Sequence, residues 1–201
     1  MEKIAAKLTD YIIKKNAVPS EDYEIYKYGF LTGIEILLSV ATCFLIAMRL
    51  HMLYECVVFL VVFIALRSFV GGLHMNSFVA CYGCSVFTFF LTLMLIAYYP
   101  ASNEASLAAI IFESLLVWKM NPVENINRPV DEEEAKLFSL RIKKILATIC
   151  VCALCAYLLK WNEILNTTMY TVLVIFISMI LGMIKNEADC KGHNNGNFVD
   201  M

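Results

Sequence analysis

Charged side chains are scarce in this sequence, and neither sign dominates. Charged residues make up 17% of the 201 positions and hydrophobic residues 60%, and the mean hydropathy is +0.70. Soluble globular domains have about 25% charged and about 45–50% apolar residues, so a single small core cannot bury this apolar excess. The surplus is expected to face lipid. Because the formal net charge is −2, the chain also lacks the basic stripe that a nucleic-acid partner requires, and no such partner is predicted.

The sequence also lacks the patterns of metal sites, disulfide scaffolds and signal peptides. Cys81 and Cys84 are separated by two residues, but no second pair of ligands follows at zinc spacing, so neither a metal nor another cofactor is predicted. Most of the eight cysteines lie in apolar runs, whereas a disulfide scaffold is short, polar and loop-rich. The first 18 residues contain no continuous apolar core of the kind that a cleavable signal peptide has.

The N-terminal stretch, residues 1–20, is instead amphipathic. Ile4, Leu8 and Ile12 recur at helical spacing among several lysines. This pattern predicts an interfacial helix that lies on the membrane surface and contacts the lipid bilayer. A helix that binds a partner protein is the alternative.

Six apolar runs account for most of the remaining chain. A helix that crosses a bilayer needs about 20 residues, and the first, third and sixth runs are long enough, whereas the second, fourth and fifth are short and are predicted to be tilted, broken or re-entrant. The sequence predicts a single all-α, polytopic membrane domain over residues 1–201, with about six transmembrane helices in a bundle over residues 28–184. The runs are Tyr28–Met48, Met52–Leu66, Phe78–Tyr99, Ala105–Trp118, Ile145–Leu159 and Ile164–Ile184.

The basic residues predict the orientation of these spans, because Lys and Arg accumulate on the cytoplasmic side of membrane proteins. If all six runs cross the membrane and the N-terminus is inside, only Arg49 and Lys160 lie outside, which leaves 14 of the 16 basic residues inside. Both termini are therefore predicted to be cytoplasmic. Residues 119–144 form the predicted cytoplasmic loop, which becomes helical toward the next span, and residues 185–201 form a predicted flexible cytoplasmic tail.

The stretch from Arg67 to Cys81 is the best candidate for a reactive site. Gly71 and Gly72 permit a backbone break, and they are followed by His74 and, seven residues later, Cys81. A cysteine nucleophile needs a base or an imidazolium beside it, because the thiolate is the reactive form. In one unbroken helix the two residues would be about 10.5 Å apart along the axis, so a dyad requires His74 to fold back. The structural alternative is an interfacial histidine and a packing cysteine.

Three neighbouring residues extend this candidate site. Cys84 lies one turn beyond Cys81 and is a rival nucleophile. Ser77 is expected either to cap the next helix or to assist the imidazole or an oxyanion. Glu35 lies inside the first span, where an ionised carboxylate costs about 2.5–3.5 kcal/mol. It is expected to face protein, with Arg67 as a candidate partner, either as a site residue or as a buried pair that orients helices.

These residues, taken in order, resemble the AgrB (accessory gene regulator B) family of Gram-positive bacteria. The resemblance includes residues 28–35, Arg67, the element Gly71-Gly72-x-His74 and Cys81 seven residues after the histidine. It continues in the polar loop, where Asn121-Pro122 is followed by Asn127-Arg128-Pro129. It covers roughly residues 23–144, and the last two spans match in character alone.

The resemblance implies a membrane cysteine endopeptidase of the bacterial cell membrane. It implies that Cys81 is the nucleophile and His74 its base, that Glu35, Arg67, Gly71, Gly72 and Ser77 support the site, and that the site lies at the cytoplasmic face. The implied substrate is an AgrD-like precursor peptide, which loses its C-terminal segment and is cyclised through an acyl-enzyme thioester to a thiolactone or lactone for quorum sensing. A homodimer is also implied.

Two other functions remain compatible with the residues. A transporter or exporter of a small peptide would use Glu35, Arg67 and the glycine break as a substrate path without proteolysis. A non-catalytic membrane scaffold would use the N-terminal helix and the polar loop for contacts. Replacement of Cys81 by serine distinguishes them, because it abolishes processing in the peptidase alone.

Overall fold

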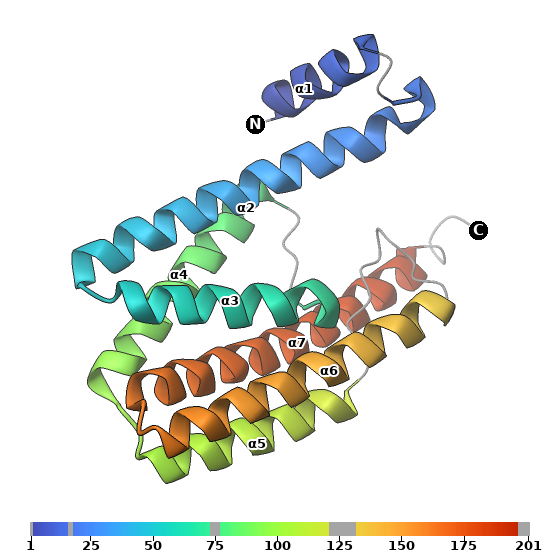
Figure 1. Cartoon of the computed structure of the whole chain (residues 1–201). Helices are drawn as coiled ribbons and strands as arrows, with labels where there is room; N and C mark the ends of the chain where they lie inside the picture. Colours follow the sequence, from blue (N-terminus) through green and yellow to red (C-terminus); the bar gives the residue numbers. More distant parts are fainter. Residues whose placement is uncertain (1, 16–17, 73–76, 121–131, 197–201) are drawn as a thin grey trace.

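All of the regular secondary structure is helical in the part of the chain that the computed structural model describes, which is residues 2–15, 18–72, 77–120 and 132–196. After a short N-terminal helix, the chain forms six longer helices that run back and forth beside one another (Figure 1). The helices are α1 (Glu2–Lys14), α2 (Tyr23–Leu50), α3 (Leu53–Val70), α4 (Phe78–Tyr98), α5 (Asn103–Lys119), α6 (Glu132–Leu158) and α7 (Asn162–Gly196), with a 3₁₀ turn η1 (Ser20–Asp22) before α2.

Four of these helices, α2, α3, α4 and α7, are long and apolar enough to cross a membrane. This confirms the prediction of an all-α membrane protein with several spans. Of the other two, α5 has 17 residues, and α6 begins with a charged segment. Within the described residues they do not reach the same length and composition, so the predicted count of about six spans is not confirmed.

Two buried clusters hold the helices together. The larger one joins the second half of α3 to α5, α6 and α7, and includes Leu66, Ile110 and Leu146. The smaller one joins α2, the first half of α3 and α4 around Phe59 and Phe89, whose rings meet edge to face 5.1 Å apart. α3 belongs to both clusters, so it connects the pair α2 and α4 to the remaining bundle.

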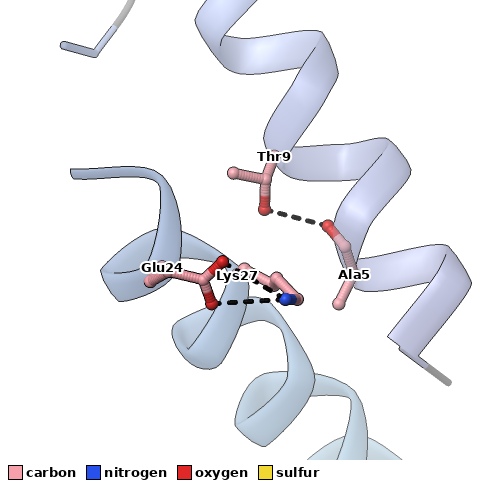
Figure 2. Close-up of polar contacts among 4 residues, drawn as sticks. All are labelled: Ala5, Thr9, Glu24 and Lys27. Carbon is pink, nitrogen blue, oxygen red and sulfur yellow. Dashed lines mark hydrogen bonds and ion pairs between the residues drawn. The ribbon is translucent and has the colours of Figure 1, made fainter. Parts of the chain in front are cut away.

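The N-terminal helix α1 packs lengthwise on the beginning of α2 (Figure 1). Its buried residues are Ala5 and Thr9, and the Thr9 hydroxyl donates to the Ala5 carbonyl (2.9 Å; Figure 2). Ile4, Leu8 and Tyr11 are exposed on another face of α1. An interfacial position for this helix therefore stays a prediction, since the contact with α2 does not place it relative to the bilayer.

The last helix differs from the predicted boundaries. α7 continues to Gly196, so most of the segment predicted as a flexible tail is helical. Extending an existing helix costs much less free energy than starting one, which explains how the helix continues past the apolar run. Similarly, residues 132–144 of the predicted cytoplasmic loop already belong to α6, whereas residues 121–131 lie outside the described part.

Candidate active site

The backbone breaks immediately after α3, as the glycine pair suggested. α3 ends at Val70, and Gly71 follows with φ 70° and ψ −151°, while Gly72 has φ 138°. Residues with a Cβ rarely adopt these angles. The two glycines therefore redirect the chain at the end of α3, before the next helix starts at Phe78.

Arg67 lies in the last turn of α3 and folds over this break. Its guanidinium donates to the carbonyl of Gly71. A Cβ added at Gly72 would overlap the Arg67 guanidinium and would lie 2.8 Å from the Ser178 hydroxyl of α7. Gly72 is thus enclosed between a cation from α3 and a hydroxyl from α7, and no larger residue fits without displacing Arg67.

The end of α3 is held in place by α6 as well. The ring of Phe69 meets Phe138 of α6 edge to face at 5.9 Å, and the guanidinium of Arg141 lies 5.4 Å from the Phe69 ring centroid. Cation–π and aromatic contacts of this kind each stabilise a packed pair by about 0.5–1.5 kcal/mol. The position of Arg67 therefore depends on three helices, α3, α6 and α7.

Cys81 lies in the first turn of α4, half-buried, and its backbone N–H donates to the Ser77 carbonyl (3.0 Å). The guanidinium of Arg67 interacts electrostatically with the thiols of both Cys81 and Cys84. A thiolate is favoured beside a cation and near a helix N-terminus. The end of α3 and the start of α4 thus meet in an electropositive environment for a thiol.

The neighbour of Cys81 fixes the start of α4 against α2. The hydroxyls of Tyr82 and Thr42 lie 2.7 Å apart. Because the Thr42 hydroxyl also donates to the Leu38 carbonyl (2.9 Å), Tyr82 is the donor in this pair. This bond links α2 to α4 one residue beyond the candidate nucleophile. No local sequence pattern predicts this bond, since 40 residues separate the two partners.

The other predicted site residues are placed differently. Ser77 occupies the N-cap position of α4 with an extended backbone, but its side chain makes no capping bond, so the expected cap is not formed. Glu35 is half-buried on α2. Among the described residues the ion pair is between Glu24 and Lys27 (3.2 Å), so Glu35 and Arg67 do not pair with each other. His74 lies outside the described residues.

Two side chains are missed by sequence reasoning, one at this site and one away from it. Ser178 reaches the glycine break from α7, more than 100 positions along the chain, and nothing in its local sequence marks it. Away from the site, Glu113 on α5 lies toward the end of its apolar run, which does not mark it as a buried residue, yet it is buried. Its spacing of seven residues from the buried Ser106 places both on one helical face, which is the signal that could have found it.

Known proteins resemble this chain along almost its whole length. The family described as Accessory gene regulator B matches residues 5–185. A protein of Clostridium perfringens (strain SM101 / Type A), whose name describes it only as AgrB-like, is 24% identical over 193 residues, which cover 91% of this chain and 87% of the relative. No solved structure matches the chain.

The matched range contains every side chain of the candidate site, from Arg67 at the end of α3 to Ser178 on α7. Together with the apolar helices, a match of this extent assigns both the family and a location in the membrane. This membrane protein of the accessory gene regulator system belongs to the AgrB family.

Proposed function

We propose that this protein is a membrane cysteine endopeptidase with Cys81 as its nucleophile. The observation that carries the proposal is the placement of the Cys81 thiol in the first turn of α4, within electrostatic reach of the Arg67 guanidinium. A cation beside a thiol favours the thiolate. Family membership supports this assignment, because AgrB proteins are associated with peptide processing.

Within this proposal, His74 is the base that removes the proton of the Cys81 thiol. The break at Gly71 and Gly72 supports this role, because it interrupts the helix that would otherwise hold the two residues two turns apart. Arg67 stabilises the thiolate that results, and Gly71 fixes Arg67 through its carbonyl. Glu35 supports substrate binding from α2, and Ser77 assists at the start of α4.

The proposed substrate is an AgrD-like precursor peptide. The thiolate attacks a peptide carbonyl, the C–N bond breaks, and the imidazolium of His74 returns its proton to the departing amine of the C-terminal segment. The remaining acyl group forms a thioester with Cys81. A thiol or hydroxyl of the peptide then attacks this thioester while the neutral His74 takes its proton, the bond to the Cys81 sulfur breaks, and the thiolactone or lactone leaves the Cys81 thiolate beside the His74 imidazolium. A partly desolvated site slows the competing attack by water.

The site is proposed to face the cytoplasm of a bacterial cell, with both termini on that side and the protein acting as a homodimer. The distribution of basic residues supports the orientation, because 14 of 16 lie on the segments that this arrangement places inside. An amphipathic precursor on the inner leaflet would then lie at the level of the glycine break.

The test is cleavage of a cognate precursor by membranes that contain the wild type, His74→Ala, Cys81→Ser or Cys84→Ser. Cys84 is a matched control, because it lies one turn beyond Cys81 and also interacts with Arg67, but it is exposed. We expect Cys81→Ser and His74→Ala to lose cleavage, Cys84→Ser to keep it, and a covalent peptide adduct to map to Cys81. Cleavage by Cys81→Ser at the wild-type rate would refute the proposal.

A further inference from the structure

A carboxyl group lies buried in the middle of α5, away from the candidate active site. Glu113 is 7% exposed, and its neighbour Ser114 is 4% exposed. The Oε2 atom of Glu113 and the Oγ atom of Ser114 have no hydrogen-bond partner within the described structure. Buried polar atoms almost always have a partner, so this pair requires an explanation.

The buried residues one turn before and one turn after Glu113 on α5 are apolar. On α5 it lies between Ile110 and Val117, which belong to the larger buried cluster. No charged group that the structure describes acts on the Glu113 carboxyl, so burial alone favours its neutral form. Among the hydrophobic residues packed against this cluster, Tyr157 and Tyr170 are titratable, and the guanidinium of Arg141 lies against Phe69 at its edge. Its remaining buried members are Leu66 and Val70 of α3, Ile142, Leu146, Ile149, Ala153 and Ala156 of α6, and Leu165, Met169, Val172, Ile175 and Met179 of α7.

Glu113 faces α7, because it shares a helical face with Ser106. These two residues are separated by seven positions, or about two turns, and Ser106 lies 3.5 Å from the Asn166 side chain of α7. The Asn166 side chain also accepts from the Ala101 backbone N–H (2.8 Å), so Ser106 lies beside a bonded polar group of α7. The Oε2 atom of Glu113 has no such partner among the described residues, and neither does the buried hydroxyl of Thr167 on α7.

An ionised carboxylate is not compatible with this position. Without a cation or a hydrogen-bond donor, a buried charge costs far more free energy than the neutral acid, and an ionisable residue inside a membrane protein marks a functional site by default. We propose that Glu113 is a proton-binding site within the packing of α5 against α7, and that loss of its proton loosens that packing.

This site is separate from the proposed peptidase site, but α7 contributes to the surroundings of both. α7 packs against α5 and supplies Ser178 at the glycine break. A movement of α7 that follows deprotonation therefore reaches the surroundings of Gly72 and Arg67.

Dicyclohexylcarbodiimide tests the proton directly, because it is apolar and adds to protonated carboxyl groups. Membranes with the wild type, Glu113→Gln or Glu104→Gln are treated at mildly acidic and at alkaline pH, and the adduct is mapped by mass spectrometry. Glu104 is the matched control, since it lies on the same helix but is exposed. We expect an adduct at Glu113 that decreases severalfold at alkaline pH, persists in Glu104→Gln and is absent in Glu113→Gln. An adduct on Glu104 but not on Glu113 would overturn the proposal.

Thermal unfolding in detergent gives a second measurement that does not depend on access of the reagent. A proton bound more tightly in the folded than in the unfolded protein stabilises at low pH, and this stabilisation is lost as pH rises. The midpoint of the wild type is therefore expected to fall toward alkaline pH relative to that of Glu113→Gln, whose amide stays neutral, while Glu104→Gln follows the wild type. A difference between wild type and Glu113→Gln that is independent of pH overturns the proposal. Protection from the carbodiimide by sodium but not by choline, at fixed pH, also overturns it and assigns a metal cation instead.

Discussion

At the scale of single residues, Arg67 connects the glycine break to the candidate nucleophile. Its guanidinium donates to the Gly71 carbonyl and interacts electrostatically with the thiols of Cys81 and Cys84. A single cation that both fixes the backbone and favours a thiolate explains why a polar side chain is retained in an apolar helix, where it is costly. The reactivity of Cys81 is therefore expected to depend on the charge at position 67.

Replacing Arg67 tests this dependence. In a Cys84→Ser background, Arg67→Met is expected to slow alkylation of Cys81 by iodoacetamide at neutral pH by about tenfold. The reason is that a neighbouring cation lowers the pKa of a thiol by about one unit or more, and the variant lacks this cation. The measurement is the rate of alkylation as a function of pH. The curve of rate against pH should move to higher pH in the variant. Arg67→Lys keeps the charge and should retain part of the effect. Equal curves for all three proteins would contradict the electrostatic role.

Gly72 permits a prediction based on packing. Gly72→Ala forces a Cβ into the Arg67 guanidinium and toward Ser178, at a φ of 138° that alanine rarely adopts. We expect loss of precursor cleavage and destabilisation by about 1–3 kcal/mol, the cost of a strained backbone position.

Gly83→Ala is the control for this substitution, because Gly83 lies on α4 and nothing lies within 4 Å of the position its Cβ would take. Helix propensity alone would make it neutral or stabilising by up to about 1 kcal/mol. Both effects are measured by thermal unfolding in detergent and by cleavage. A Gly72→Ala protein as stable and active as Gly83→Ala would show that the close contact does not matter.

At the scale of helices, Asn166 fixes the start of α7 against α5 and the turn before it. Its side chain accepts from the Ala101 N–H at 2.8 Å, donates to the Ala101 carbonyl at 3.4 Å and lies 3.5 Å from the Ser106 hydroxyl. Asn166→Leu leaves these buried groups without partners, which costs about 1–3 kcal/mol, and a lower unfolding midpoint is expected.

Asn162 provides the matched control one turn earlier on α7. It is exposed and contacts Asn103 at 2.6 Å. Asn162→Leu is expected to change the midpoint little, because exposed groups regain their hydrogen bonds from water. Equal losses in the two variants would show that Asn166 has no special role.

Sequence reasoning located the helices better than it located the site. The first apolar run, Tyr28–Met48, falls within α2, because hydropathy reports directly which segments avoid water. The glycine break was also predictable, since two adjacent glycines after an apolar run leave few alternatives. Contacts between distant segments were not: Ser178 meets Gly72, and Thr42 meets Tyr82, through packing that local patterns do not encode.

The C-terminal segment and Glu35 are two cases in which local sequence patterns led to an expectation that the structure does not bear out. Composition predicted a flexible segment after Ile184, yet α7 continues to Gly196 through glycines and asparagines, which have poor helix propensity. The charges of Glu35 and Arg67 suggested a pair, but Arg67 instead bonds a backbone carbonyl. Opposite charges in one sequence identify candidates for pairing and not the partners.

At the scale of the whole molecule, the arrangement of α5 and α6 decides the membrane topology. Both lie beside α7 in the bundle and are joined by residues 120–131 (Figure 1). With the proposed cytoplasmic N-terminus, Lys119 at the end of α5 lies outside if α2, α3, α4 and α7 alone cross the membrane. If α5 and α6 cross as well, Lys119 lies inside while Lys160, between α6 and α7, lies outside in both cases.

Labelling of single cysteines in intact cells separates these two topologies. In a background without the eight native cysteines, Lys119→Cys and Lys160→Cys are treated with a membrane-impermeant maleimide. We expect Lys160→Cys to react in intact cells and Lys119→Cys to react only after permeabilisation. Basic residues favour the cytoplasmic side, and six spans would place both Lys119 and Lys185 there. Labelling of both positions in intact cells would instead assign four spans. In that case α5 and α6, with the buried Glu113, would form a layer outside the bilayer, and the hydrophobic exterior of α5 would need another covering.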